Sequence, residues 1–405
     1  MSELEKNNLE KTVEYHGPLD DIKKELEASY FKPDWGIEFH EKIGEGGLGE
    51  VWKGYLIGKY DRQEIAIKVS KRFDLSSLRK EAHIAGQLKH DDIGKIFLYD
   101  ENNGRGMIIM EYIRGNDLAK IVDRHKKLGL RMPQKFSAFI VWVCCEALKY
   151  AHKARVYDEL GKEIIGVLHR DISPGNIIVN NNGYTKIVDF GIGILSSDLL
   201  NHNIREQIAG KIGFIAPEIL EPELIKGEFI DQKVDIYSLG MVADYLARGK
   251  NPLIEKITDS QYKHEAVAES KDILKKGFIP LNEDALGIDE EYYKIVKKAT
   301  EIDRKKRYCS AFEMKEDLKE YLYKEYGPDR DRLRLYIDLI YSPGIIRCLE
   351  DIKSKNNAEI SLMLKNKIEE AKNLMPYMVR NGKFCLETVK DSGYETEEEG
   401  YLAIY

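Results

Sequence analysis

Apolar residues recur at every second position in several short runs between Ile37 and Tyr112, and this alternation predicts β-strands. The runs read EVWKGYLIG, EIAIKVS, GKIFLYD and GMIIMEYI. Between the second and the third, SSLRKEAHIAGQLK carries apolar residues every three or four positions, which is typical of a helix. The pattern therefore predicts a small antiparallel sheet with one helix packed on it.

Helical spacing dominates from about Asn116 to Tyr326, apart from a loop-rich stretch at 156–218. After Gly327 the helical pattern continues up to an acidic, tyrosine-bearing end, whereas the first residues are charged and only patchily apolar. We therefore expect an N-terminal arm, a small β-rich lobe, a larger helical lobe and a helical C-terminal extension with an acidic tail, at residues 1–37, 38–112, 113–326 and 327–405.

The composition is that of an ordinary globular chain, with 405 residues, 43% of them hydrophobic, and a formal net charge of -7. This balance gives no support to nucleic-acid binding as the main task. The longest apolar run, Phe136–Cys145, is about half of the ~20 residues that a membrane-spanning helix needs. The N-terminus also lacks the apolar core of a secretory signal. We expect a cytoplasmic protein without membrane or nucleic-acid partners.

The cysteines are five, an odd number without a CxxC pair. Their spacing indicates neither a disulfide framework nor a zinc site. We expect structural thiols in a reducing compartment.

A glycine-rich segment, IGEGGLGEV, places Gly44, Gly46 and Gly49 in a GxGxxG pattern with Val51 two residues beyond. Glycines let backbone amides close on phosphates without a Cβ in the way. Predicted strands flank the pattern on both sides, which argues against a dinucleotide-binding fold, where a helix follows the glycines. A glycine-rich hairpin of purely structural use fits the same pattern.

The next strand, EIAIKV, contains a charged residue, Lys68, among apolar neighbours. Such a lysine either extends its ammonium to solvent or meets a partner. The following helix offers Glu81 beside an apolar face formed by Leu78, Ala82 and Ala85. A Glu81–Lys68 pair would hold the ammonium against nucleotide phosphates.

These segments are followed by HRDISPGN at 169–176, DFG at 189–191 and APE at 216–218. In this order and spacing the chain resembles the eukaryotic-like (Hanks-type) serine/threonine protein kinases over roughly residues 38–326, and a bacterial subgroup with an HRDxSPxN loop in particular. The resemblance implies an α+β bilobal fold, with a β-rich lobe that carries one helix and a larger helical lobe. It also implies that Asp235 and Gly240 in VDIYSLG are structural and that Arg307 pairs with Glu218.

The resemblance implies ATP and Mg²⁺, or Mn²⁺ in its place, as cofactors. Asp171 would accept the proton of the substrate hydroxyl, Asn176 and Asp189 would ligate the metal, and Lys68 and Glu81 would position the phosphates. Backbone groups of Glu111 and of Ile113 or Tyr112 would bind adenine. Further residues of the nucleotide site would be the glycines of the hairpin, Val51, Ala66, Met110 and, at the ribose, Asp117. For Met110 and Tyr112, ordinary core packing is an equal alternative.

Two positions depart from the family pattern. Ser173 stands where most serine/threonine members have a lysine, and Lys211 stands where they have a threonine. We hypothesise an exchange, in which Lys211 supplies the cation and Ser173 the hydroxyl. The alternative is that Lys211 faces solvent or contacts substrate.

Regulation and substrate class leave alternatives open. Arg170 usually binds a loop phosphate in this family, whereas here Glu206 stands near the usual phosphosite, so we predict activity without loop phosphorylation. The rival interpretations are a pseudokinase that serves as an ATP-binding scaffold and a small-molecule kinase. The catalytic lysine and aspartates argue against the first, and the APE and VDIYSLG segments favour protein substrates. The C-terminal extension could dock on the lobes, bind a regulatory partner or hold a substrate.

Overall fold

A computed structural model describes most of the region between residues 35 and 341 and two short strands near the C-terminus. The described ranges are 35–46, 49–70, 75–102, 105–128, 131–190, 213–220, 230–251, 288–323, 329–341, 379–380 and 383–384. The chain divides into two units. The first comprises Met1–Leu75 and Asp100–Tyr112, and the second comprises Ser76–Tyr99 and Ile113–Tyr405.

Four strands of a five-stranded sheet lie in the first unit and pair antiparallel, as the alternation predicts. The strand order of the sheet is β1-β2-β3-β5-β4, and the β1/β2, β2/β3 and β3/β5 pairs all run antiparallel. The strands are β1 (Trp35–Gly46), β2 (Gly49–Gly58), β3 (Arg62–Ser70), β4 (Ile96–Asn102) and β5 (Arg105–Glu111). Strand β1 starts three residues before the lobe boundary expected at 38, because Ile37 is already fully buried in the sheet's core.

The two faces of β3 differ in what they pack against. Ile65, Ile67 and Val69 pack into the small hydrophobic core of this unit. Since side chains alternate along a strand, Ala66 and Lys68 lie on the opposite face. Both faces are buried, with Lys68 only 5% exposed, which explains why the sequence of β3 is apolar on both sides of the charged residue.

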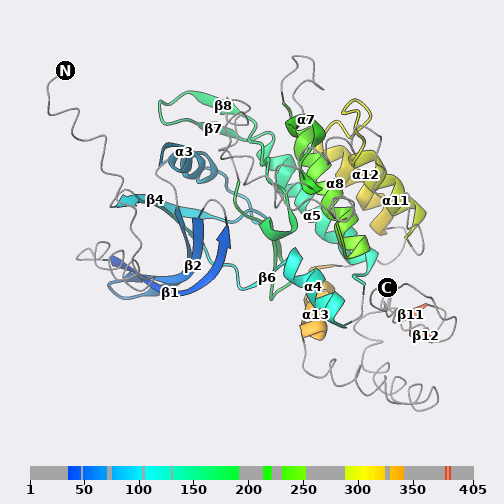
Figure 1. The fold of residues 1–405 in the computed structure, drawn as a ribbon, viewed down its shortest axis with the longest axis horizontal. Coiled ribbons are helices and arrows are strands. Elements are labelled where there is room, and N and C mark those ends of the chain that lie inside the picture. The colour runs from blue at the N-terminus through cyan, green and yellow to red at the C-terminus, as the bar shows by residue number, and fades with distance from the viewer. Residues whose placement is uncertain are drawn as a thin grey trace, which may run out of the picture. The chain divides into compact units, whose positions relative to one another are not determined.

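The second unit is mainly helical and contains the long helices that the sequence predicts. Figure 1 shows α5, α8, α11 and α12 side by side. The helices are α3 (Leu75–Ala85), α4 (Leu118–Leu128), α5 (Gln134–Ala151), α7 (Pro217–Leu220), α8 (Lys233–Arg248), α11 (Glu290–Ala299), α12 (Ala311–Tyr323) and α13 (Arg330–Tyr341). The helix expected in the β-rich lobe, α3, falls almost wholly in this second unit.

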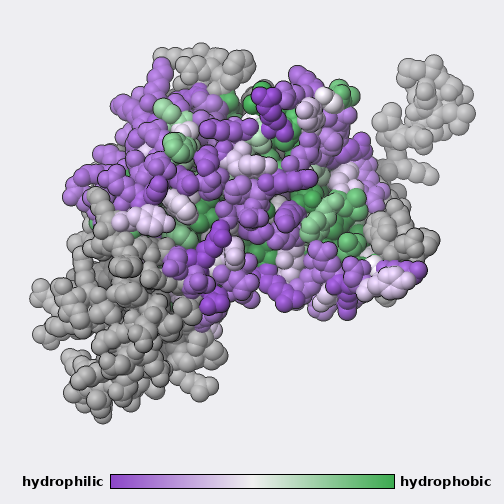
Figure 2. Space-filling model, turned by 180° about the vertical axis from the view of Figure 1, so that it is seen from behind, coloured by the Kyte–Doolittle hydropathy of each residue, from purple (hydrophilic) through white to green (hydrophobic). Residues whose placement is uncertain are grey.

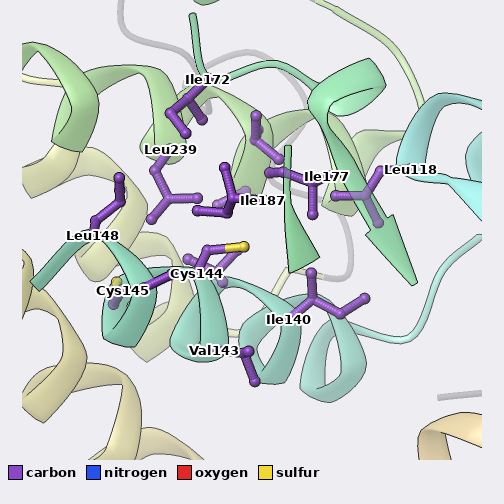
Figure 3. Packing of buried hydrophobic residues seen from close by; sticks show 14 of the residues in the cluster. Leu118, Ile140, Val143, Cys144, Cys145, Leu148, Ile172, Ile177, Ile187 and Leu239 are labelled. Atoms are coloured by element: carbon purple, nitrogen blue, oxygen red, sulfur yellow. The ribbon is translucent and has the colours of Figure 1, made fainter. Parts of the chain in front are cut away.

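Helix α5 forms the centre of the large core. The apolar run at 136–145 is therefore explained by burial inside the protein. Figure 3 shows Leu148 and the two cysteines of α5 among Ile172, Ile187 and Leu239. Cys144 and Cys145 are buried, and burial raises the pKa of both thiols, so both stay protonated as packing groups. This confirms the structural role expected of these two cysteines.

The stretch 156–218 was predicted to be loop-rich, and its described part contains short strands. The strands β9 (Ile177–Asn180), β10 (Thr185–Ile187) and β6 (Gly115–Asp117) form a sheet in the order β10-β9-β6. A separate hairpin pairs β7 (Arg155–Tyr157) with β8 (Glu163–Ile165), and another pairs β11 (Val379–Arg380) with β12 (Lys383–Phe384). Strands of two to four residues are too short to show a period in sequence.

Helix α13 packs on α4 in the second unit (Figure 1), and its Tyr336 contacts Phe136 of α5. Tyr336 is fully buried, stacks on Phe136 with ring centroids 4.6 Å apart, and bonds through its hydroxyl to Nε2 of His125. At the end of the helix, Arg124 Nε donates to the carbonyl of Ile340 at 2.8 Å. The first helix of the expected extension therefore shares the core of the helical unit.

Hydrophilic residues cover most of the described surface in Figure 2, with hydrophobic residues visible in smaller patches between them. Among the described residues, none of the helices combines the length and the hydropathy that crossing a membrane would require.

Candidate active site

The glycine-rich segment forms an antiparallel hairpin between β1 and β2. Gly46 pairs with Gly49, and Gly44 pairs with Val51. A Cβ added at Gly49 would lie 2.1 Å from the carbonyl oxygen of Val69, so only glycine allows this approach to β3. At Gly49, then, the pattern also reflects strand packing within the sheet.

Several predicted nucleotide-binding residues share one face of this sheet. Val51 lies opposite Lys68, and Ala66 lies opposite Met110. Directly paired residues of antiparallel strands project from the same face, so these four lie on the face opposite the core residue Ile67. The register thus brings together side chains that are up to 59 residues apart in sequence, from Val51 to Met110.

Glu81 lies on α3 and is 7% exposed. The apolar face predicted for this helix is confirmed, because Leu78, Ala82 and Ala85 are all buried. A carboxylate in this position has lost most of its water and needs polar partners to remain ionised.

The loop at residues 169–176, which is the predicted catalytic loop, brings Asp171 and Asn176 into direct contact. The side-chain amide of Asn176 donates to the backbone carbonyl of Asp171 at 2.8 Å and to its carboxylate at 2.9 Å. A short 3-10 turn, η1 (Pro174–Asn176), returns the chain so that this contact can form. The amide fixes the direction of the Asp171 carboxylate, which a group that must accept a proton requires.

Asp189 follows a segment that is tied to the same loop. Val188 N donates to the carbonyl of Asn176 at 2.9 Å, and Nε2 of His169 lies 3.0 Å from the carbonyl of Val188. The ring of His169 also packs against Phe190 at 4.5 Å. Burial lowers the pKa of His169, so the neutral ring donates from Nε2 and accepts the Asp171 N–H at Nδ1, at 3.2 Å. These bonds hold the two predicted metal ligands, Asn176 and Asp189, close together.

Asp235 anchors the catalytic loop from α8. Its carboxylate accepts bonds from His169 N at 2.8 Å, Arg170 N at 2.7 Å and Nε2 of His152 at 2.8 Å. Burial opposes its ionisation, but the His152 bond and the other donors hold the pKa of Asp235 below its usual value. The backbone of Arg170 is left-handed, with φ 61°, and the Asp235 bond helps to hold that conformation.

The other residues predicted to bind the nucleotide are Asp117, Ile113, Glu111 and Met110. Asp117 immediately precedes α4 and caps it: its carboxylate accepts from Lys120 N at 2.9 Å and pairs with Lys120 Nζ at 2.9 Å. Ile113 is buried, whereas Glu111 and Met110 are partly exposed. Asp117 is therefore at least a helix cap.

Ser173 is buried, at 5% exposure, in extended backbone before η1. Its backbone carbonyl accepts from Asn176 N at 3.0 Å. The positions invoked with it, Lys211 and Glu206, lie outside the described residues.

The predicted pair of Arg307 and Glu218 is confirmed. Two parallel bonds of 2.6 and 2.9 Å join the guanidinium to the carboxylate, and both side chains are buried. Arg307 also donates to the carbonyl of Ile302 at 3.1 Å and lies over the ring of Tyr237 at 4.8 Å. This network ties α7 to the segment between α11 and α12.

Two features go beyond the prediction from sequence. One is the set of bonds made by Asp235: the resemblance implied a structural role for this residue, but nothing in the sequence shows which backbone amides it will meet. The other is the hairpin β7–β8, which is held to the end of α3 by Gln87. The only sequence signal for the hairpin is a pair of short apolar runs on either side of a DELGK turn.

A family model described as "Protein kinase domain" matches residues 37–319. The probable serine/threonine-protein kinase PknB of Bifidobacterium longum is 29% identical over 296 residues, or 69% of this chain and 39% of that protein. PknB of Mycolicibacterium smegmatis is 30% identical over 292 residues, or 69% and 42%. The chain thus spans less than half the length of these curated relatives. The crystal structure of the Mycobacterium tuberculosis PknI kinase domain is 19% identical, with 72% of this chain and 96% of that one covered and a TM-score of 0.47.

Proposed function

Because the chain belongs to the protein kinase family, we propose that it is an ATP-dependent protein kinase that transfers the γ-phosphate to serine or threonine hydroxyls of protein substrates and of itself. One observation carries this proposal: the Asn176 amide is bonded to both the carbonyl and the carboxylate of Asp171. An aspartate oriented in this way is ready to accept the proton of an incoming hydroxyl. The serine/threonine specificity follows the two curated relatives, which carry it in their names.

The donor set near Asp171 suits a hard divalent cation. Asn176 and Asp189 offer amide and carboxylate oxygens, which Mg²⁺ and Mn²⁺ prefer. Among the described residues there is no group of three or more His, Cys, Asp and Glu side chains that could hold a metal alone. That agrees with Mg²⁺ bound through one or two protein groups and the phosphates of ATP. The cation would neutralise charge on the transferring phosphoryl group.

The other residues position ATP. The glycine hairpin would cover the phosphates, and Lys68 paired with Glu81 would hold the α- and β-phosphates. The sheet face of Val51, Ala66 and Met110 would pack against adenine, whose edge would meet backbone groups of Glu111 and Ile113. Asp117 could serve the ribose only if Lys120 shares its carboxylate.

Phosphotransfer can be tested with labelled ATP and Mg²⁺, with the protein alone and with cell lysate. Lys68→Met and Asp171→Asn should each lower incorporation by at least about a hundredfold, because the first removes the group that positions the α- and β-phosphates and the second removes the group that accepts the hydroxyl proton. Mass spectrometry would then identify the labelled residues. Equal labelling by the wild type and both variants would exclude the enzyme, and labelled metabolites without labelled protein would favour the small-molecule kinase.

Ser173 and Lys211 form a second part of the proposal. Ser173 is buried three residues before Asn176, where a long lysine side chain would have to find room. We propose that Lys211, further along the sequence, supplies the missing cation. Lys211→Ala should then lower kcat at least about tenfold, with a smaller effect of Ser173→Ala. Near-normal kcat in Lys211→Ala would contradict the exchange.

Regulation and location stay predictions. If Glu206 replaces a loop phosphate opposite Arg170, phosphatase treatment should leave activity unchanged; a loss of activity would contradict this. The protein substrates, a regulatory partner for the residues after Tyr341 and the cytoplasmic location are likewise expectations from the sequence.

A further inference from the structure

The hairpin β7–β8 is inserted directly before the catalytic loop. It starts four residues after α5 ends, and Ile165, its last residue, precedes Asp171 by six. Two backbone bonds close its base: Gly166 N donates to the carbonyl of Ala154 at 2.9 Å, and Val167 N to that of Ala151 at 2.8 Å. Because of these bonds, the hairpin, the end of α5 and the start of the catalytic segment form one connected piece.

Gln87 joins this piece to α3. Its Nε2 donates to the carbonyl of Tyr157 at 2.7 Å, and its Oε1 accepts from Tyr157 N at 2.9 Å. The side-chain amide therefore pairs with the outer edge of β7 as a peptide group of another strand would. Nε2 also donates to the carbonyl of His83 at 3.0 Å, which satisfies one of the last carbonyls of α3.

These three bonds use both donors and the acceptor of one carboxamide, and this sets a chemical requirement at position 87. A glutamate would keep the acceptor but present oxygen to two carbonyls. An asparagine is one methylene shorter and cannot span the same distance. Figure 1 shows the hairpin beside α3 within the second unit.

The helix that Gln87 holds carries Glu81, six residues earlier and 7% exposed. An α-helix moves as a rigid element, so a bond at its carboxyl end restricts the position of Glu81. On its other side, Gln87 is bonded to β7, and the chain that continues from β8 reaches Asp171 six residues after Ile165. We propose that Gln87 is a positioning residue of the phosphotransfer reaction, and that the inserted hairpin sets the place of α3 relative to the catalytic segment. This inference rests on the proposed kinase function.

The bonds from Gln87 lie at an exposed edge of the hairpin, although Val156 of β7 is buried in the large core. Tyr157 is 50% exposed, and Leu160 and Ile165 are 93% and 65% exposed, so water can replace the bonds to Gln87 when that residue is changed. The segment after α3 keeps a separate anchor, because Lys89 N donates to the hydroxyl of Tyr150 at 3.0 Å. Loss of the Gln87 bonds should therefore move or loosen α3 without unfolding the protein.

The test compares the full-length wild type with Gln87→Leu and Gln87→Glu. With ATP, Mg²⁺ and dephosphorylated casein as acceptor, both variants should lose about threefold to tenfold in kcat, while KM for casein stays within about twofold. Hydrogen exchange measured without nucleotide should become faster in the peptide covering 75–88. Leu160→Ser, at the exposed tip of the same hairpin, is the matched control and should match the wild type in both measurements.

Unchanged exchange at 75–88 in Gln87→Leu would overturn the inference, as would a kcat within twofold of the wild type. A fall in kcat that came with a proportional fall in the thermal midpoint would assign Gln87 to stability alone and also overturn it. If the wild type transferred no phosphate, the kinase proposal would fail, and the exchange measurement would still decide whether Gln87 holds α3.

Discussion

Replacing Asp235 by asparagine tests whether the anchor on α8 holds the catalytic loop. The substitution keeps the shape of the side chain but removes its charge and turns one acceptor oxygen into a donor. In the wild type, both oxygens accept: Oδ1 from Arg170 N, and Oδ2 from His169 N and His152 Nε2. The least disruptive placement of the asparagine keeps its oxygen at the two donors and turns its NH₂ towards Arg170 N.

The expected cost follows from these bonds. The bond from Arg170 N is lost, which removes about 1.5 to 3 kcal/mol for a hydrogen bond to a charged group in a site with no exposure. The two remaining bonds become neutral and weaken by about 1 kcal/mol each. Together these losses lower the unfolding free energy by about 3.5 to 5 kcal/mol. Release of Arg170 from its left-handed conformation should also let Asp171 move and lower kcat at least about tenfold.

Urea unfolding followed by circular dichroism would measure the stability, and labelled ATP the rate. The pH dependence gives a second readout. Because the folded pKa of Asp235 lies below its unfolded value, its contribution is present above the unfolded pKa and disappears as pH falls through the folded pKa. The wild type should therefore lose more stability than Asp235→Asn in acid. An unfolding free energy within about 1 kcal/mol of the wild type at pH 7, with normal kcat, would refute the anchoring role.

Three further predictions concern the buried contacts. Burial lowers the pKa of His125 to about 4, below the usual ~6.5 of an unfolded histidine. The unfolding free energy measured in urea should therefore fall by up to about 3 kcal/mol between pH 6.5 and pH 4. His125→Gln should remove this pH dependence. Tyr336→Phe, which leaves His125 without its hydroxyl partner, should cost about 1 to 3 kcal/mol in the same assay, and an unchanged midpoint would contradict that bond. Arg307→Ala leaves Glu218 buried without its partner and should cost about 3 to 5 kcal/mol, with Glu218→Gln in the same background expected to restore part of the loss.

The long elements could be predicted from the sequence because their periods extend over many residues. Apolar residues recur with helical spacing along the eighteen residues of α5. Its cysteines pack at positions where an apolar side chain is expected. The hairpin β7–β8 could not be predicted, because three residues on each strand carry too little pattern. Its connection to Gln87 depends on a contact across 70 positions that no local signal marks.

The candidate site divides in a similar way. Asp171, Asn176 and Asp189 were predicted through the family motifs, and the structure brings the first two into contact and ties the third to the same loop. The charge of Lys68 in an apolar strand was visible in the sequence, but its alignment with Val51 depends on strand register. The structural role of Asp235 was also expected from its motif, but its bonding partners, like the cap formed by Asp117, are visible only in the structure.

Helix α13 has a practical consequence for anyone who shortens this chain. The family match ends at residue 319, and the sequence alone suggested a boundary at 326. A fragment cut at either point would lose Tyr336 and uncover the ring of Phe136 and the imidazole of His125. Such a fragment would expose a new apolar surface to solvent and would aggregate during expression. The shortest useful C-terminus for recombinant work is therefore after Tyr341.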